Sequence, residues 1–589
     1  MDTEERVTPE EPTDARRRIG VYICHCGGNI SDFVDVAAVR DAVAGDPGVV
    51  HVETTLFACS DATQHDMIEQ IHQDGLDGLV VASCSPKLHV PTFRAVARRA
   101  GLNQFQYTQV NIREQCSWVH SDDRAGATDK ATGLVRAGIG HASLSVPLDP
   151  VTVATVPAAL VVGGGVAGLR AAVGLAELGL GVTLVERADH LGGAVGELGT
   201  MFPSGLAGRD LVAQLVDEVA ARPAITVLLE TELVAKSGTF GNYEVTLRGP
   251  AGSEPVTQTV GVLVIATGFD SYEPALGEFG YGIDGVLTLP EFTHLVDSSS
   301  GPLTHAGRPV RSIAYVYCVG SRQPGGNEYC SKYCCTATAH VAVEVAKRDD
   351  RVAQYHLYRD VRTYGVYELL YEEARKRGSV YLKFADDEPP AVTREGDQLV
   401  VTTRDTLTAD ATLQIPVDLV VLVTGMVPTA NHDLTSLLKL PLGSDGFYNE
   451  IHPKLRPVET VVDGVLIAGA SQGPKTVSES VASALAAVAQ SGAMLLKGQA
   501  ELNPLVAVVD DACAWCGACA SVCPYDAIEQ VEIDGRAVAR ISPTACKGCG
   551  GCAPYCPNEA INLLGVTTDQ VQHMIAGMAG DVHEEVLVS

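Results

Sequence analysis

Aromatic residues, basic residues and long apolar runs are scarce in this sequence of 589 residues. Aromatic residues make up 5% of the chain, and 42 lysines and arginines stand against 72 aspartates and glutamates, for a formal net charge of −30. This balance argues against a nucleic-acid partner, because binding to phosphates requires a basic surface. No uninterrupted run of about 18 apolar residues occurs, and the N-terminus lacks a basic segment followed by an apolar one. We therefore expect a cytoplasmic protein without a transmembrane segment.

Glycine, small apolar residues and cysteine are abundant instead. The 59 glycines and the hydrophobic fraction of 46% are typical of α/β layers rich in alanine and valine. At roughly 100–200 residues per domain, a chain of this length is expected to form about three or four domains. In a reducing compartment, clustered cysteines such as the 17 found here are more often metal or redox ligands than structural disulfides.

One stretch carries the signature of a dinucleotide-binding fold. An apolar strand at 160–162 is followed by Gly163-x-Gly165-x-x-Gly168 and an Ala/Leu-rich helix. Gly163 makes the tight turn, Gly165 lets backbone amides approach a pyrophosphate, and Gly168 lets the helix pack closely on the strand. A second strand ends in Glu186, which is placed to accept a ribose hydroxyl. The candidate binding residues of this stretch are Gly163, Gly165, Val166, Ala167, Gly168, Glu186, Arg187, Gly192 and Gly193.

Two later segments complete the flavin-binding domain. A strand at 262–265 leads into Ala266-Thr267-Gly268, a turn that packs close to the cofactor in flavoproteins with two dinucleotide domains. Residues 464–496 predict a strand, a turn containing Gly469 and Ala470, and a long helix. In flavoproteins of the glutathione and thioredoxin reductase type, the N-terminus of this helix is directed at the isoalloxazine ring. Their usual aspartate is here Ala470, so one hydrogen bond to the ribityl chain has to come from another residue.

A second dinucleotide-like domain lacks the glycine fingerprint. Its first strand lies within 312–322, and Cys318, Cys330, Cys334 and Cys335 occupy the place where a nicotinamide pyrophosphate would bind. Four thiolates at a helix N-terminus suit an anionic iron–sulfur cluster, because helix amides stabilise negative charge. A redox disulfide and inert packing are the alternatives, although the adjacent Cys334 and Cys335 cannot easily pair with each other.

Two consecutive ferredoxin motifs near the C-terminus predict two [4Fe–4S] clusters. Each motif has the spacing C-x2-C-x2-C-x3-C-P, and in this pattern the fourth cysteine of each run ligates the other cluster. Zinc could in principle use the CxxC pairs, but the internal repeat and the proline after each fourth cysteine favour the clusters. The first cluster is expected on Cys513, Cys516, Cys519 and Cys556, and the second on Cys546, Cys549, Cys552 and Cys523.

The N-terminal region predicts a further α/β domain with cysteines near its strand ends. Strands are expected at 19–24, 50–57 and 78–82, with a helix at 62–73 between them. Ligands from the carboxyl ends of adjacent strands converge on one edge of such a sheet. Four of the five cysteines could therefore hold a [4Fe–4S] cluster, although a buried cysteine is also a small hydrophobe. The five are Cys24, Cys26, Cys59, Cys84 and Cys116.

The composition shifts along the chain predict the following boundaries. We expect a disordered tail at 1–18, an iron–sulfur α/β domain at 19–142, a linker at 143–157, the first part of the FAD domain at 158–310, a degenerate NAD-like domain with a cysteine cluster at 311–430, the flavin return segment at 431–500, a two-cluster ferredoxin domain at 505–565 and an acidic tail at 566–589.

From Gly20 to Pro557 the sequence resembles the A subunit of heterodisulfide reductase. The resemblance is carried by VYICHCGGNI, CSPKLHVPTF, NIREQCSWVH, LVVGGGVAGLRAA, CVGSR with YCSKYCC, YRDVRTYG, AGASQGPKTV and the two ferredoxin runs. It implies FAD, a thioredoxin-reductase-like α/β core without a working NAD(P)H site, and clusters on the Cys318 and N-terminal sets. It further implies partners in a multisubunit complex, namely B- and C-type iron–sulfur subunits and a hydrogenase-, formate- or ferredoxin-linked donor, and a homodimer within that complex.

Two departures from this family bear on the electron path. Longer members carry an inserted ferredoxin, whereas residues 193–260 contain no cysteine. Members that split electron pairs commonly have a lysine five residues after the CC pair, near the flavin N5, and His340 stands there in this chain. His340 is the candidate catalytic residue, and its identity weakens any inference of bifurcation.

The resemblance predicts an electron-transfer protein within a complex, with the heterodisulfide reduced by a different subunit. Cys334–Cys335 acting as a catalytic dithiol is a rival hypothesis within the same class. An NAD(P)H oxidoreductase of the glutamate synthase small-subunit kind and a cluster-bearing scaffold without turnover are two further hypotheses. The NAD(P)H oxidoreductase requires the second GxGxxG, which residues 312–322 lack.

Overall fold

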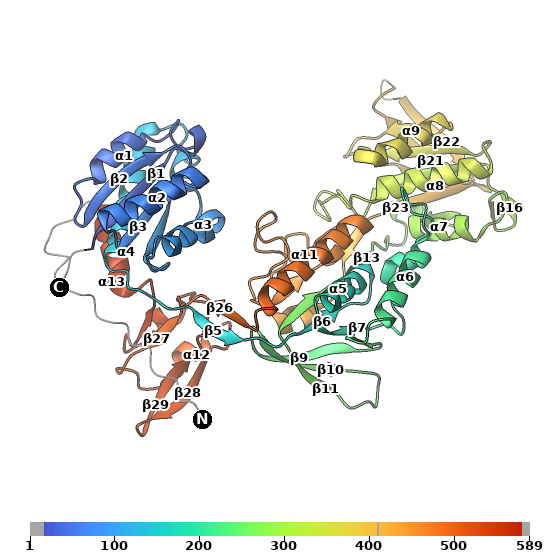
Figure 1. Cartoon of the computed structure of the whole chain (residues 1–589). Helices are drawn as coiled ribbons and strands as arrows, with labels where there is room; N and C mark the ends of the chain where they lie inside the picture. The colour runs from blue at the N-terminus through green and yellow to red at the C-terminus, as the bar shows by residue number, and fades with distance from the viewer. Residues whose placement is uncertain (1–16, 409–410, 580–589) are drawn as a thin grey trace. The chain divides into compact units, whose positions relative to one another are not determined.

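The computed structural model describes residues 17–408 and 411–579 and divides them between two compact units (Figure 1). One unit combines Met1–Thr152 with Glu501–Ser589, and the other is Val153–Ala500. The N-terminal domain and the ferredoxin motifs, which lie far apart in the sequence, therefore belong to the same unit. The predicted α/β fold class is confirmed in both units.

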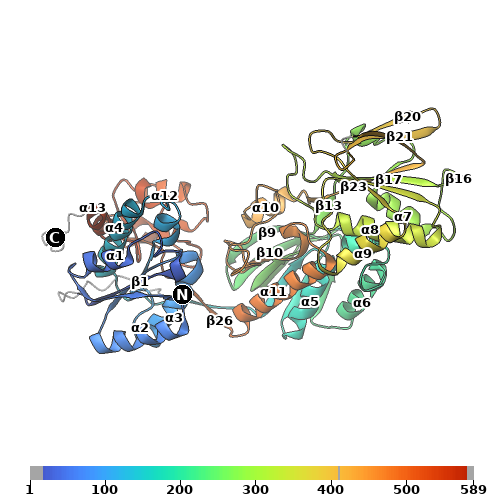
Figure 2. The ribbon, with the colours of Figure 1, turned by 90° about the horizontal axis from the view of Figure 1, so that it is seen from above.

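The N-terminal domain is built on a parallel sheet with strand order β2-β1-β3-β4. The central strands β1 and β3 are buried along their whole length, as expected for parallel strands covered on both faces. Figure 2 shows α2 and α3 on one face of this sheet and α1 and α4 on the other. The elements are β1 (Ile19–Cys24), α1 (Val36–Val43), β2 (Val49–Thr55), α2 (Asp61–Asp74), β3 (Gly78–Ser83), α3 (Pro86–Arg99), β4 (Tyr107–Asn111) and α4 (Arg124–Ser143).

The ferredoxin region consists of two short antiparallel strand pairs, β27 with β30 and β28 with β29. It is followed by a helix, α13, which packs along α4 of the N-terminal domain. Glycines permit this close approach, because a Cβ on Gly140 would lie 2.7 Å from the carbonyl oxygen of His573 and one on Gly577 would lie 2.8 Å from that of Arg136. The elements are β27 (Ala507–Val509), α12 (Ala518–Ser521), β28 (Ile528–Ile533), β29 (Arg536–Ile541), β30 (Ile561–Leu563) and α13 (Thr568–Ala579).

Three segments predicted as tails or a linker contain residues with regular structure or specific contacts. The acidic tail at 566–589 contains α13, since Gly577 and its neighbours pack on α4; residues 580–589 lie outside the described part of the chain. The linker at 143–157 contains strand β5 (Val151–Ala154). Arg17 and Arg18, the last two residues of the tail predicted at 1–18, make specific contacts. The Arg18 amide donates to Asp77 at 2.6 Å, and Arg17 donates to the Ser145 carbonyl oxygen. Residues 1–16 lie outside the described part.

The first domain of the flavin unit contains a parallel sheet with strand order β25-β12-β6-β7-β8 and an antiparallel sheet of β9, β10 and β11. Strand β25, which follows the second domain in the sequence, forms the edge of this sheet by pairing with β12. The chain therefore returns to the first domain after completing the second. The elements are β6 (Ala158–Val162), α5 (Val166–Glu177), β7 (Gly181–Val185), α6 (Gly208–Ala220), β8 (Ile225–Leu228), β9 (Glu232–Thr239), β10 (Asn242–Arg248), β11 (Val256–Val260), β12 (Val262–Ile265), β25 (Val465–Ile467), α11 (Val477–Leu495) and β26 (Gln499–Leu502).

The second domain repeats this plan, with a parallel sheet of order β14-β23-β17-β18-β19 and an antiparallel sheet of β20, β21 and β22. The first FAD segment was predicted to extend to residue 310, and this is wrong, because β14 pairs with β23 of the second sheet. The elements are β13 (Phe269–Ser271), β14 (Val286–Thr288), α7 (Leu289–Ser298), β15 (Thr304–His305), β16 (Arg308–Pro309), β17 (Ser312–Val319), α8 (Cys334–Arg348), β18 (Ala353–Tyr358), α9 (Glu368–Lys376), β19 (Val380–Lys383), β20 (Ala391–Glu395), β21 (Gln398–Asp405), β22 (Ala411–Val417), β23 (Leu419–Thr424) and β24 (Met426–Pro428). Helix α10 (His432–Leu438) follows and packs on β9 of the first domain.

Candidate functional site

The glycine turn lies between the carboxyl end of β6 and the first turn of α5. Gly163 has a backbone φ of 109°, and a Cβ there would lie 2.4 Å from the carbonyl oxygen of Ala266. A Cβ on Gly168 would lie 1.8 Å from the carbonyl oxygen of Gly163. A Cβ on Gly165, in contrast, would meet only the Cα of Gly193, at 4.0 Å. The protein itself therefore requires glycine at 163 and 168, whereas Gly165 keeps space open in front of the α5 amides.

Glu186 and the following glycine pair close around the same turn. The Glu186 carboxylate accepts hydrogen bonds from the amides of Gly164 at 2.6 Å and Ala188 at 2.9 Å. The amide of Gly192 donates to the carbonyl oxygen of Gly164 at 2.9 Å, and Gly192 forms a parallel β-bridge with Gly165. The remaining predicted residues here are Val166 and Ala167, buried in the first turn of α5, Gly193, and the exposed Arg187.

The turns after β12 and β25 meet this edge as well. A Cβ on Gly469 would lie 2.6 Å from the Cβ of Ala167, so the return segment packs directly on the start of α5. Ala470 is buried in the same turn, and Ala266, Thr267 and Gly268 follow β12. All the predicted FAD residues are thus gathered at the carboxyl edge of one parallel sheet. The open space at Gly165 and the adjacent helix N-terminus fit a pyrophosphate.

Four cysteines lie together where β17 leads into α8. Cys318 is near the end of β17, Cys330 lies in the connection 320–333, and Cys334 and Cys335 form the first turn of α8. The Cys334 thiol is hydrogen-bonded to Cys335 and interacts electrostatically with Cys318 and Cys330. Burial raises the pKa of the Cys318 thiol to about 11, whereas the hydrogen bond with Cys334 outweighs burial and lowers the pKa of Cys335 to about 7.

Arginines surround this cysteine set. Arg322 and Arg359 lower the pKa of Cys318 against the larger effect of burial, and Arg322 and Arg362 favour the thiolate of Cys335. Arg322 is held by an ion pair with Asp360 at 2.8 Å. Positive charge of this kind stabilises an anionic iron–sulfur cluster and raises its potential.

The connection from β17 to α8 differs from a nucleotide-binding turn. In the first domain residues 163–165 link the strand to the helix, whereas residues 320–333 do so here. The ring of Tyr272 covers the start of this connection, because a Cβ on Gly320 would lie 2.0 Å from its Cγ. The tight glycine turn that holds a nicotinamide pyrophosphate is therefore replaced by a longer loop carrying Cys330.

His340 lies on α8, facing the loop that follows Gly193. Its ring is 6.5 Å from that of Phe202, which is in turn 6.2 Å from Tyr367, and its Nε2 is 3.9 Å from Glu344. Burial lowers the pKa of His340, although Glu344 opposes this effect. The imidazole is accordingly neutral at pH 7, unlike the lysine that it replaces.

The ferredoxin cysteines line a cavity that combines both motifs. The cavity is lined by Cys513, Cys516 and Cys519 of the first motif together with Cys556 of the second. This is the crossed arrangement expected from the sequence. Equivalent amides donate to the fourth cysteine of each run, from Ala527 to Cys523 Sγ at 3.4 Å and from Ala560 to Cys556 Sγ at 3.3 Å. Cys546, Cys549 and Cys552 complete the two runs.

Within residues 17–408 and 411–579, no three histidine, cysteine, aspartate or glutamate side chains are arranged to hold a single metal ion. A [4Fe–4S] cluster spreads its thiolates around a cube of iron and sulfur, so its ligands lie farther apart than those of one ion. The cavity lined by Cys513 and its three partner cysteines has the donor chemistry of a cluster site.

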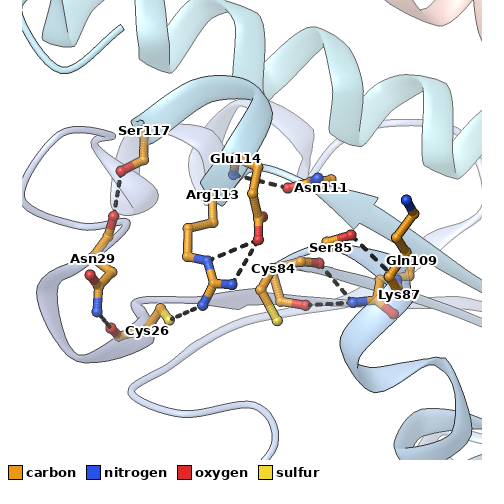
Figure 3. Close-up of polar contacts among 11 residues, drawn as sticks. Cys26, Asn29, Cys84, Ser85, Lys87, Gln109, Asn111, Arg113, Glu114 and Ser117 are labelled. Carbon is orange, nitrogen blue, oxygen red and sulfur yellow. Dashed lines mark hydrogen bonds and ion pairs between the residues drawn. The ribbon is translucent and has the colours of Figure 1, made fainter. Parts of the chain in front are cut away.

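Four of the five N-terminal cysteines gather at the carboxyl edge of their sheet. The Cys24 thiol interacts electrostatically with Cys26 and Cys59, and the Cys84 thiol with Cys26 and Cys24. Arg113 donates to Cys26 Sγ at 3.6 Å and forms an ion pair with Glu114 at 2.7 Å (Figure 3). Burial raises the pKa of the Cys84 thiol to about 11, and Arg113 acts against this effect.

Cys116 is placed differently. It is fully buried in the core of the N-terminal domain, and burial raises the pKa of its thiol to about 11. Lys130 of α4 is the charged group that affects it, and none of the other four cysteines does so. Its burial is that of a packed small hydrophobe.

The charged partners of the cysteines could not be identified from the sequence. Arg113 at Cys26 and Arg322 at Cys318 become evident only from their contacts. One indication of these arginines was available from the sequence, namely that they lie inside motifs peculiar to the family.

The helices of the described residues include none that is both long and apolar enough to cross a membrane.

Comparison with known families identifies two parts of the chain. Residues 157–313 match the pyridine nucleotide-disulphide oxidoreductase family, and residues 509–566 match the 4Fe-4S dicluster domain. A thioredoxin reductase structure from T. acidophilum aligns with 57% of this chain and 97% of its own, at 18% identity and a TM-score of 0.41.

Several relatives match nearly the whole chain. One iron-sulfur A subunit of the CoB--CoM heterodisulfide reductase of Methanopyrus kandleri is 34% identical over 90% of this chain and 93% of its own length. The A subunit of the H(2):CoB-CoM heterodisulfide,ferredoxin reductase of Methanothermobacter thermautotrophicus is 34% identical over 88% and 91%. The A subunit of a Ferredoxin/F(420)H(2)-dependent CoB-CoM heterodisulfide reductase of Methanosarcina acetivorans is 32% identical over 87% and 75%.

The fold, the glycine turn and the crossed ferredoxin cavity define an oxidoreductase that carries FAD and two [4Fe–4S] clusters. Within that class, the chain belongs to the family of heterodisulfide reductase A subunits. It is the flavin- and iron–sulfur-containing electron-transfer subunit of a multisubunit oxidoreductase.

Proposed function

We propose that the chain carries four [4Fe–4S] clusters and connects them through FAD. When bound, FAD exchanges electrons in pairs with one side and singly with the clusters. The glycine turn and Glu186 hold the dinucleotide, and the first turn of α11 is directed toward its ring system. The cysteine sets position the clusters along the path. The observation that carries this proposal is the gathering of Cys318, Cys330, Cys334 and Cys335 where a nicotinamide site would otherwise lie.

The third and fourth clusters are assigned to specific cysteines. The Cys318 set receives support from its surrounding arginines and from the N-terminus of α8. For the N-terminal cluster we assign Cys24, Cys26, Cys59 and Cys84, because these thiols interact with one another, and we assign Cys116 to the core. Arg113 would stabilise the Cys26 thiolate of that cluster.

Its partners and location are inferred from the family to which the chain belongs. We assign it B- and C-type iron–sulfur subunits, a hydrogenase-, formate- or ferredoxin-linked electron donor, a second copy of the chain in the complex, and a cytoplasmic location. Names of the H(2)-, H(2)/formate- and ferredoxin/F(420)H(2)-dependent enzymes support such donors. His340 is assigned to the flavin as a catalytic imidazole whose lowered pKa favours the neutral form. Electron bifurcation is supported by the names of the ferredoxin-coupled relatives, although His340 in place of the usual lysine weakens that inference.

Iron and flavin quantification on the anaerobically purified chain tests the four clusters. About sixteen irons per FAD are expected for four [4Fe–4S] clusters, and about eight if only the ferredoxin domain is loaded. Replacing Cys318 or Cys84 by serine is expected to remove about four irons each, because each substitution deletes one ligand of a separate cluster. Cys116→Ser serves as the control, and it should leave both the iron content and the stepwise EPR reduction unchanged. A value of about eight irons in the unsubstituted chain would refute the proposal.

Reduction by different donors separates this function from its NAD(P)H-dependent rival. Dithionite or a reduced ferredoxin is expected to bleach the flavin absorbance, whereas an excess of NADH or NADPH leaves it unchanged. The reason is that residues 320–333 and the Tyr272 ring replace the tight glycine turn of a nicotinamide site. Absorbance at the flavin maximum is the measurement, and a function like that of the glutamate synthase small subunit requires rapid bleaching by NADPH.

A further inference from the structure

One carboxylate joins the two dinucleotide-like domains of the flavin unit. Oε1 of Glu479 accepts hydrogen bonds from Nζ of Lys332 at 2.8 Å and from the hydroxyl of Tyr364 at 3.2 Å. Oε2 accepts from the amide of Thr476 at 2.8 Å and from its hydroxyl at 3.2 Å, which closes the capping box at the start of α11. Lys332 and Tyr364 lie in the second domain, whereas Thr476 and Glu479 lie in the first.

Both donors from the second domain lie on segments that touch the cysteine set. The backbone amide of Lys332 donates to Cys330 Sγ at 3.4 Å, and its φ of 61° places the residue in the left-handed region. Tyr364 lies on the segment after β18, where the carbonyl oxygen of Asp360 accepts a hydrogen bond from the Cys335 thiol at 3.9 Å. A displacement of the loop around Lys332 would therefore move Cys330, and a displacement of the segment after β18 would move the carbonyl group that contacts Cys335.

The electrostatics of this contact favour a fixed arrangement. Burial raises the pKa of the Glu479 carboxyl, but the hydrogen bonds from Lys332, the Thr476 amide and Tyr364 outweigh burial and hold the pKa below its usual value. The side chains of Lys332 and Glu479 are 40% and 34% exposed, and an isolated pair this exposed contributes little. Here, however, the carboxylate is already immobilised by the helix cap, so less conformational entropy is lost when the lysine binds.

We propose that Glu479 is a positioning residue that fastens the Cys330–Cys335 loop to the N-terminus of α11, so that the flavin site and the cysteine site keep one separation during turnover. Electron transfer slows steeply with distance, so a fixed separation between the two sites prevents its rate from varying. This consequence rests on the proposed cluster at the Cys318 set, whereas the fastening of the loop does not.

Hydrogen–deuterium exchange on the anaerobic holoprotein tests the proposal. In Glu479→Gln the amide side chain still closes the capping box, but it no longer carries the charge that holds Lys332. In Lys332→Met the cap is untouched and the ammonium is lost. Both variants are expected to exchange the amides of 329–334 about fivefold faster, the effect of losing roughly 1 kcal/mol of interaction. Glu479→Gln should also speed exchange in 361–367, whereas Lys332→Met should not, because it leaves the bond from Tyr364 to Glu479 in place. In 329–334 the double variant should exchange no faster than either single one, since both remove the bond between Lys332 and Glu479.

Glu291→Gln is the matched control. Glu291 closes the same kind of capping box with Thr288 at the start of α7, and both residues belong to the second domain. In the Glu291→Gln variant, the amides of 329–334 and 361–367 should exchange at the same rate as in the unsubstituted chain. Unchanged exchange in Glu479→Gln, or effects of the two substitutions that multiply in the double variant, would overturn the proposal. Iron content measured on the same samples reports separately whether the Cys318 set carries a cluster.

Discussion

Gly165→Ala is expected to abolish FAD binding while the chain remains folded. The new Cβ would meet only the Cα of Gly193 at 4.0 Å, an ordinary van der Waals contact. It would, however, occupy the space through which a pyrophosphate approaches the amides of α5. We expect the flavin content to fall to less than about a tenth of its original value. Flavin released by denaturation and quantified by its absorbance gives the result, and circular dichroism together with iron content reports the fold.

A contrasting glycine and a neutral one provide the controls. Gly168→Ala should reduce both flavin content and folded protein, because its Cβ would lie 1.8 Å from the carbonyl oxygen of Gly163. Gly301→Ala, where a Cβ would have no neighbour within 4 Å, should change neither. If Gly165→Ala retained full flavin content, the cofactor would have to lie away from this turn, and the assignment of the binding residues would be wrong.

Serine substitutions in pairs are expected to reveal which cysteines share a cluster. Cys513 and Cys556 line the same cavity, so Cys513→Ser with Cys556→Ser should remove one cluster, or about four irons. Cys546→Ser with Cys556→Ser should remove both ferredoxin clusters, or about eight irons, because the second substitution strikes the cluster of the first motif. Iron analysis and the EPR signals of the reduced protein provide the measurement.

The two double variants serve as controls for each other. If each motif held its own cluster, the two double variants would exchange results, with Cys546→Ser and Cys556→Ser removing only about four irons. Substitution by serine leaves the chain length and backbone unchanged, so the comparison depends on ligand identity alone. Equal losses in both double variants would show instead that the two clusters do not assemble independently.

Several elements of the site could be predicted because their chemistry is local in the sequence. The spacing of Gly163, Gly165 and Gly168 specifies a turn within one strand–turn–helix unit, and the structure contains that unit. The spacing of Cys513, Cys516 and Cys519 places three ligands on one short loop, and the known ferredoxin pattern supplied the fourth from the other run. The strands with uniformly apolar residues were found for the same reason, since β1 and β12 are buried throughout.

Other features depended on contacts between distant residues and were missed or mistaken. The first FAD segment was expected to run to residue 310, but strand β14 within it pairs with β23, which begins about 130 residues later in the chain. Helix α13 lies in the segment expected as an acidic tail, and it packs against α4 at Gly140 and Gly577. No periodic pattern in either segment indicated its partner.

The sequence by itself determined the cofactor classes of this protein: a dinucleotide turn for FAD and a doubled cysteine motif for two [4Fe–4S] clusters. Only the tertiary structure decided that Cys116 belongs to the core while Cys24, Cys26, Cys59 and Cys84 share one sheet edge, and that Glu479 reaches Lys332. The physical reason is that a motif specifies chemistry through neighbouring residues, whereas side-chain partners are selected by burial and charge between segments that meet only after the chain has folded.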